Sequence, residues 1–93
     1  MLIGEGMNVA TVEIYSKATC PYCIRAKRLL DMKKVEYREI SVDYDSEARA
    51  EMIQRAGGRT TVPQIFIDGR HIGGCDDLFG LEMDGKLADL LAA

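Results

Sequence analysis

The spacing of apolar residues divides the chain into alternating strand-like and helix-like segments. Residues 9–16 and 35–42 are rich in β-branched and aromatic side chains, with apolar positions at about every second residue. This pattern predicts two strands. Between them, apolar residues recur at intervals of three and four over residues 21–34, which predicts a helix whose outer face is basic.

The next part of the chain predicts one further helix and a hairpin. A helix capped by Asp45 or Ser46 is expected to run to about Ala56, where a pair of glycines ends it. The β-rich run 62–67 is followed by Asp68-Gly69, a pair typical of a two-residue hairpin turn. The residues after that turn should therefore return as an antiparallel strand.

Two short helices are expected to close the chain. The first starts near Cys75-Asp76-Asp77, where an aspartate can act as N-cap, and runs through Leu81, while the second covers residues 87–91. The first two strands are joined through a helix, so they should be parallel with a right-handed crossover. The sequence therefore predicts an α/β fold: a small mixed sheet, two parallel strands plus an antiparallel hairpin, flanked by helices.

Length and charge narrow the range of functions. We expect a single domain over residues 9–93 of the 93-residue chain, preceded by a flexible tail at 1–8. The formal net charge of −3 argues against non-specific nucleic-acid binding, although residues 17–38 carry seven cations and two anions. No apolar run approaches the roughly 18 residues of a membrane span, and no signal peptide is recognised. A cytoplasmic, reducing compartment is expected.

The three cysteines point to reactive thiols. An odd number, with Cys20 and Cys23 only two residues apart, argues against a disulfide framework. A zinc site would need Cys20, Cys23, Cys75 and the single histidine, His71. No second C-x-x-C pair exists, so we expect no bound metal.

Cys20-Pro21-Tyr22-Cys23 stands where the first strand and loop give way to the first helix. Thr19 or Cys20 can cap this helix, and Pro21 suits its first turn. The helix N-terminus favours negative charge, and the thiolate is the reactive form of cysteine. Cys20 should then be the exposed nucleophile and Cys23, one turn later, a less exposed second thiol. The motif predicts thiol–disulfide exchange.

Val62-Pro63 allows two interpretations. The proline can simply start a strand, a position where its missing N–H is tolerated. Alternatively, the peptide bond is cis and leaves the main-chain groups of Val62 free to pair with an extended peptide. Spacing alone does not choose between them.

Three blocks together resemble the glutaredoxins, most closely the small bacterial dithiol type. They are Cys20-Pro21-Tyr22-Cys23, the run from Thr61 to Ile67 around Val62-Pro63, and the run Gly73-Gly74-Cys75-Asp76-Asp77-Leu78. Their order and spacing match that family over nearly the whole chain from about Asn8. The resemblance implies a thioredoxin fold with a four-stranded sheet, a cis-proline at Pro63, and glutathione as reducing co-substrate without a permanently bound cofactor.

The resemblance also implies roles for individual residues. Cys20 is then the nucleophile and the site of a glutathione mixed disulfide, and Cys23 the resolving thiol, needed for protein disulfides only. The implied glutathione-binding residues are Lys17, Tyr22, Arg59, Thr61, Val62, Pro63, Cys75, Asp76 and Asp77. Gln64 is an alternative to Arg59 at the glycyl carboxylate. The implied partners are disulfide-containing or glutathionylated proteins, with ribonucleotide reductase as a family expectation, and the implied oligomeric state is a monomer.

Charge arguments support a glutathione site independently. Glutathione carries two carboxylates and one ammonium, so a site needs cations at one end and helix N–H groups with an acid at the other. Lys17 and Arg59 are expected at one end of the groove, with Cys75-Asp76-Asp77 at the other. The alternatives are that Lys17 and Arg59 are ordinary surface and that Asp76 is only an N-cap.

Cys75 has two possible roles, and His71 is given a structural one. Cys75 is either a small residue that fills a tight turn, which we favour, or a secondary oxidation site. His71 in the hairpin has no carboxylate partner that the sequence identifies, and we interpret it as structural.

Two rival functions remain. One is a carrier of an iron–sulfur cluster bridged by Cys20 and glutathione; relatives of that kind have a C-G-F-S motif, which Pro21 and Cys23 do not match. The other is a thioredoxin-like protein reduced directly by a flavoenzyme. Tyr22, Lys17 and the acidic block after Gly74 favour glutathione instead.

Overall fold

Four strands form one mixed sheet in the order β2-β1-β3-β4. The computed structural model describes residues 10–92. The elements are, in chain order, β1 (Val12–Ser16), α2 (Pro21–Met32), β2 (Arg38–Ser41), α3 (Ser46–Arg55), β3 (Gln64–Ile67), β4 (Arg70–Gly73), α4 (Cys75–Met83) and α5 (Leu87–Leu91). Strand β1 pairs parallel with β2 and antiparallel with β3, which pairs antiparallel with β4. The predicted fold class is confirmed.

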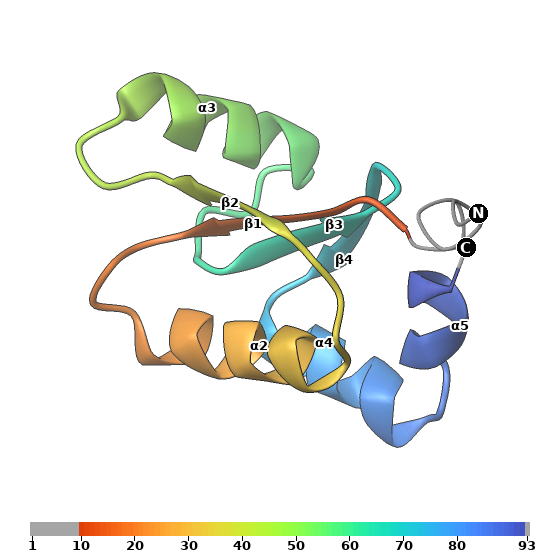
Figure 1. Cartoon of the computed structure of the whole chain (residues 1–93). Coiled ribbons are helices and arrows are strands. Elements are labelled where there is room, and N and C mark those ends of the chain that lie inside the picture. Colours follow the sequence, from red (N-terminus) through yellow and green to blue (C-terminus); the bar gives the residue numbers. More distant parts are fainter. Residues whose placement is uncertain (1–9, 93) are drawn as a thin grey trace, which may run out of the picture.

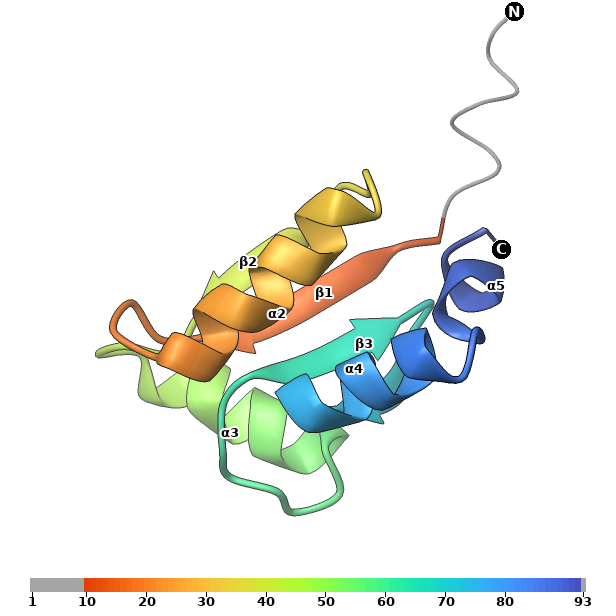
Figure 2. The same ribbon diagram turned by 90° about the horizontal axis from the view of Figure 1, so that it is seen from below.

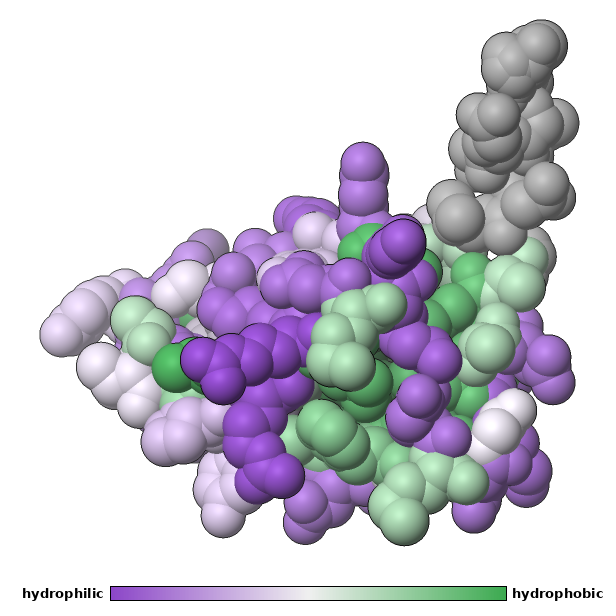
Figure 3. Space-filling view, turned by 60° about the horizontal axis from the view of Figure 1, so that its bottom comes forward, coloured by the Kyte–Doolittle hydropathy of each residue, from purple (hydrophilic) through white to green (hydrophobic). Residues whose placement is uncertain are grey.

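The helices cover both faces of this sheet. Figure 1 shows α3 on one face and α2 with α4 on the other, with α5 near the end of the sheet. Figure 2 views the sheet from the face opposite α3, and there α2 and α4 lie next to each other across the sheet. The outer surface of this layer, which comes forward in Figure 3, carries hydrophobic patches among hydrophilic side chains.

Each face of the sheet has its own apolar core. Ile14 and Ile65 pack with Leu30 on the side of α2, α4 and α5, whereas Tyr15 and Phe66 pack on the side of α3. Neighbouring residues of one strand thus face opposite cores, as the pleat requires. Every residue of β3 is buried for this reason. Fully burying a side chain such as Leu30 contributes about 1.5–3 kcal/mol.

Several predicted boundaries differ from the structure. The strand predicted over 35–42 pairs only at Arg38–Ser41, and the one predicted over 62–67 starts at Gln64. The first helix ends at Met32, because Lys34 adopts a left-handed conformation with φ 62°. Apolar residues beside these elements, such as Tyr37 and Val62, are partly buried against the two cores without joining the sheet, so periodicity overestimates element length.

Other predictions at element ends are resolved as follows. Asp45 is the N-cap of α3, and Asp68 and Gly69 both have positive φ, as a tight hairpin turn requires. The N-cap of α4 is Gly74 and not an aspartate, although the Asp77 carboxylate accepts from the Gly74 N–H, and the helix continues two residues past Leu81. The start of the first strand at residue 9 and the tail at 1–8 lie outside the described residues.

A charged cluster ties α3 to the sheet. Arg55 Nη1 donates to Tyr15 Oη at 2.8 Å, and Nη2 pairs with Glu13 Oε1 at 2.8 Å. The guanidinium also lies 4.1 Å from the centroid of the Phe66 ring, a cation–π arrangement. This cluster fixes the sheet on the face opposite α2, the helix that carries the two-cysteine motif.

Within residues 10–92, none of the helices has both the length and the apolar character that crossing a membrane would take.

Candidate functional site

Cys20 begins helix α2 as its N-cap. Its Sγ accepts a hydrogen bond from the Cys23 main-chain N–H at 3.2 Å, and Pro21 occupies the first turn. The helix N-terminus and this N–H both direct positive partial charge toward the Cys20 sulfur. Cys20 is partly exposed, whereas Cys23 is fully buried, as predicted.

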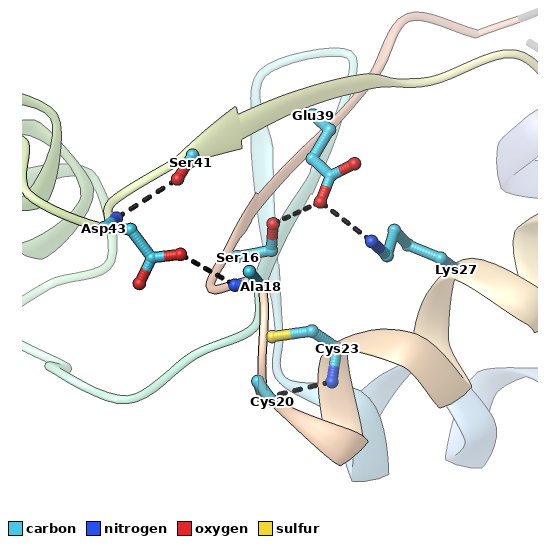
Figure 4. Close-up of polar contacts among 8 residues, drawn as sticks. All are labelled: Ser16, Ala18, Cys20, Cys23, Lys27, Glu39, Ser41 and Asp43. Atoms are coloured by element: carbon cyan, nitrogen blue, oxygen red, sulfur yellow. Dashed lines mark hydrogen bonds and ion pairs between the residues drawn. The ribbon is translucent and has the colours of Figure 1, made fainter.

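The loop before Cys20 is held by an acid from the neighbouring strand end. The Asp43 carboxylate accepts from the Ala18 main-chain N–H at 2.7 Å, and the Asp43 N–H in turn donates to Ser41 Oγ at 3.1 Å (Figure 4). The role of Asp43 was not predicted from the sequence. Its only signal was an acid directly after the second strand, at the sheet edge where the first loop also ends.

The two cysteines differ sharply in their environment. Burial, and secondly the neighbouring Cys20 sulfur, raise the pKa of the Cys23 thiol to about 12. Cys23 is therefore protonated at neutral pH and cannot compete with Cys20 for an incoming disulfide. The arrangement provides one sulfur for attack and a second that reacts only after it loses a proton.

The Val62-Pro63 peptide bond is cis. This decides between the two interpretations of the sequence and agrees with the expectation from the resemblance. Cys20 Sγ lies 3.7 Å from the Val62 carbonyl oxygen, in hydrogen-bond range for sulfur. The segment before β3 therefore runs beside the exposed cysteine.

A groove of about 260 Å³ runs along this segment. All of the predicted glutathione-binding residues except Lys17 line it, together with Gly74: Tyr22, Arg59, Thr61, Val62, Pro63, Cys75, Asp76 and Asp77. Lys17 is exposed in the loop before α2, where its carbonyl oxygen accepts from the Cys20 N–H at 3.3 Å. The fold thus gathers residues from three distant parts of the sequence around one groove.

The far wall of the groove is the N-terminus of α4. Asp77 Oδ2 accepts from the Gly74 N–H at 2.8 Å and lies 3.2 Å from Arg59 Nη1. The Gly74 hydrogen bond, and after it the Arg59 guanidinium, lower the pKa of the Asp77 carboxyl. Gly73 has φ 121°, and any Cβ there would collide with this carboxylate. The turn is therefore specified by glycine and aspartate together.

This contact corrects the predicted charge layout. Arg59 was expected beside Lys17, at the end of the groove opposite the aspartates, but its guanidinium pairs with Asp77. The loop between α3 and β3 carries Arg59 across to the start of α4, a long-range placement that spacing cannot reveal.

Gln64 is not a groove residue, so its predicted alternative role at a carboxylate is wrong. Its side chain is completely buried, and its Nε2 donates to the Thr61 carbonyl oxygen at 3.0 Å. Its Oε1 lies 2.6 Å from His71 Nε2, which is therefore the donor. Burial lowers the pKa of His71, and its ring packs 5.1 Å from that of Phe66. The structural interpretation of His71 agrees with these contacts.

Cys75 is buried at the first turn of α4. Burial raises the pKa of its thiol, with a smaller opposing effect from Arg25. Both predicted roles of Cys75 stay predictions. Within residues 10–92, no cluster of three or more histidine, cysteine or acidic side chains with metal-site geometry is found.

Comparison with known proteins places this site in a family. The sequence model of the glutaredoxin family matches residues 12–72. Glutaredoxin 3 of Escherichia coli K12 is 59% identical over 83 residues, which are 89% of this chain and 99% of that protein. Glutaredoxin 1 of Rickettsia typhi is 57% identical over 82 residues, 87% of this chain and 79% of that one.

Solved structures give the same result. The solution structure of glutaredoxin from Brucella melitensis is 52% identical and superimposes with a TM-score of 0.80 over 91% of both chains. A crystal structure of a buckwheat glutaredoxin–glutathione complex is 37% identical, with a TM-score of 0.80 over 96% of this chain and 83% of that one.

Proposed function

Because the chain belongs to the glutaredoxin family, we propose that Cys20 is the nucleophile of a glutathione-dependent thiol–disulfide oxidoreductase and Cys23 its resolving thiol. Family membership implies the general activity: the protein is a glutaredoxin oxidoreductase with glutathione-dependent thiol redox activity. The residue roles are supported by the asymmetry of the two sulfurs.

That asymmetry is the observation on which the assignment rests. Cys20 is partly exposed, and its Sγ caps α2 and lies beside the Val62 carbonyl oxygen at the groove. Cys23 is completely buried. The Cys20 thiolate attacks a glutathione mixed disulfide on a protein, forms a bond to the glutathione sulfur and releases the protein thiolate, which takes up a proton. A second glutathione thiolate then attacks the Cys20-bound glutathione and releases glutathione disulfide.

Protein disulfides require the second cysteine. Cys20 first forms a mixed disulfide with one sulfur of the substrate, and Cys23 then attacks Cys20 and releases the reduced protein. We therefore assign two activities, removal of glutathione from glutathionylated proteins through Cys20 alone and electron donation to protein disulfides through both cysteines. Disulfide substrates such as ribonucleotide reductase belong to the second class.

The groove supports glutathione as the partner of Cys20. We assign the main chain of Val62 to the cysteinyl part of glutathione, which would lie extended between Cys20 and α4. The N–H groups at the start of α4, together with the Asp76 carboxylate, would hold the γ-glutamyl end. Arg59 is already paired with Asp77. This leaves Lys17 as the cation we assign to the glycyl carboxylate.

The use of glutathione as the reductant also predicts a cellular location for the protein. The cytosol keeps thiols reduced, so we propose a cytoplasmic location in which the reduced Cys20–Cys23 pair is maintained. We further propose that the protein acts as a monomer, as its resemblance to the small dithiol glutaredoxins implies.

A turnover assay tests the assignment. Reduced glutathione, NADPH and glutathione reductase are supplied, and reduction of a small glutathione mixed disulfide is compared for the wild type, Cys20→Ser and Cys23→Ser. We expect Cys20→Ser to be inactive and Cys23→Ser to keep much of the activity, while both lose reduction of a protein disulfide. Full activity of Cys20→Ser on the mixed disulfide would refute the proposal.

A further inference from the structure

The resolving step requires a buried thiol to ionise. Cys23 is completely buried, and burial raises the pKa of its thiol to about 12. A buried thiolate needs a compensating positive charge or hydrogen bonds. The surroundings of Cys23 therefore have to supply one of these before Cys23 can attack.

The side chain one turn further along α2 is a lysine. Lys27 is four residues after Cys23, so the two side chains share one face of the helix. Figure 4 shows the Cys23 sulfur pointing toward the end of β1 and Lys27 extending from the same helix toward β2. Neither the two-cysteine motif nor the groove uses this lysine.

Two residues of the sheet hold Lys27 in this position. Lys27 Nζ lies 2.8 Å from Glu39 Oε2 on β2, and the same oxygen accepts from Ser16 Oγ on β1 at 2.5 Å. Ser16 is almost completely buried. The Lys27 and Ser16 hydrogen bonds lower the pKa of the Glu39 carboxyl, and Glu39 raises the pKa of Lys27. The Lys27–Glu39 pair therefore stays charged at neutral pH. Together with Ser16 it joins α2, β2 and β1 beside Cys23 (Figure 4).

We propose that Lys27 is a positioning residue for the resolving step: its ammonium, held in place by Glu39 and Ser16, favours the Cys23 thiolate as it forms. The proposal rests on the proposed function, because it presupposes that Cys23 resolves a mixed disulfide on Cys20. In that step the Cys23 thiol loses its proton and its sulfur forms a bond to Cys20. The bond from Cys20 to the glutathione sulfur breaks, and the glutathione thiolate leaves and takes up a proton.

The other groups around Cys23 do not replace this charge. The Cys20 sulfur at the start of α2 raises the pKa of Cys23, whereas the Lys17 main chain and the Lys27 ammonium lower it. Beyond Lys27, Glu39 and Tyr37 act on the lysine ammonium from the side of β2, and at the start of α4 the Cys20 sulfur and Asp76 act on Cys75. The Lys17 main chain stays in every side-chain variant, so substituting Lys27 isolates the ammonium.

Rapid quenching provides the test. Reduced protein is mixed with glutathione disulfide and quenched in acid at successive times. Mass spectrometry then separates the reduced form, the glutathione adduct and the internal Cys20–Cys23 disulfide. In Lys27→Met we expect the adduct to persist about three- to tenfold longer than in the wild type, the effect of one partly screened unit charge. The pH at which conversion of the adduct to the internal disulfide accelerates should also be higher in Lys27→Met than in the wild type. Lys27→Arg, which keeps the charge, should restore conversion to within about twofold.

Helix α2 offers a matched control. Lys33 forms an ion pair with Glu82 at the same 2.8 Å and with similar exposure, but lies near the other end of the helix. Lys33→Met should convert its adduct at close to the wild-type rate. Equal adduct lifetimes in Lys27→Met and Lys33→Met, or a Lys27→Arg protein as slow as Lys27→Met, would overturn the proposal. If no adduct forms even in Cys23→Ser, the proposed function itself fails, which is a distinct outcome.

Discussion

Asp77 should carry much of the stability of the groove wall. Its carboxylate accepts the Gly74 N–H at the start of α4 and pairs with Arg59. Losing a helix-capping acceptor costs about 1 kcal/mol, within a range of roughly 0.5–2. The Arg59 pair is about half exposed on both sides, so it adds about 0.2–1 kcal/mol. We therefore expect Asp77→Ala to lower the free energy of unfolding by about 1–2 kcal/mol.

Thermal unfolding followed by circular dichroism gives the measurement. For a domain of this size, about 1 kcal/mol corresponds to roughly 4–8 °C in Tm, so Asp77→Ala should melt roughly 5–15 °C lower. Asp76→Ala is the matched control, because Asp76 precedes Asp77 on the same helix and, among residues 10–92, no hydrogen-bond or ion-pair partner of its side chain is found. Its stability should change by no more than about 0.5 kcal/mol.

The dependence on pH provides a second check. The folded-state pKa of Asp77 is lowered, so its stabilisation is present above the unfolded-state value of about 3.9 and is lost as the pH falls through the folded-state value. The difference in stability between the wild type and Asp77→Ala should therefore shrink below about pH 4. Equal melting of Asp77→Ala and Asp76→Ala at pH 7 would refute the assigned role of Asp77.

Three further predictions concern the rest of the fold. Leu30→Ala empties part of the core under α2 and should lower the free energy of unfolding by about 2–5 kcal/mol in urea titration; a loss below 1 would contradict the assigned packing. Arg55→Met leaves Glu13 and the Tyr15 hydroxyl without their donor and should lower it by about 1–3 kcal/mol. Because Arg55 lies on the face opposite α2, its mixed-disulfide turnover at 25 °C should match the wild type. Burial lowers the pKa of His71, so unfolding should become easier as the pH falls below about 6.5; His71→Phe should flatten this slope, and an unchanged slope would exclude His71 as its source.

Sequence patterns identified the fold because local and long-range signals agree. The C-x-x-C pair at a strand-to-helix junction and the Asp68-Gly69 turn each specify local geometry through steric and capping preferences. Order along the chain then limits the topology to a parallel crossover followed by a hairpin. The ends of elements were less predictable, since residues flanking β2 and β3 are apolar for packing reasons and not because they pair.

Most of the residues that line the groove were predicted, but the contacts among them were not. Most of the predicted groove residues do line one groove, because short blocks separated along the sequence meet at the end of β1, the start of β3 and the start of α4. The pairing of Arg59 with Asp77, and the turning of Gln64 inward to His71, depend on how two loops cross in space. The ion pair of Lys27 with Glu39 depends in the same way on how α2 lies across β2.

The most direct test of the central claim is to find which sulfur carries glutathione. Cys23→Ser protein is treated with glutathione disulfide, digested without reductant and mapped by mass spectrometry. We expect a single adduct on Cys20, which is released on addition of reduced glutathione. An adduct on Cys75 in place of Cys20, or a Cys20 that stays unmodified, would rule out Cys20 as the nucleophile.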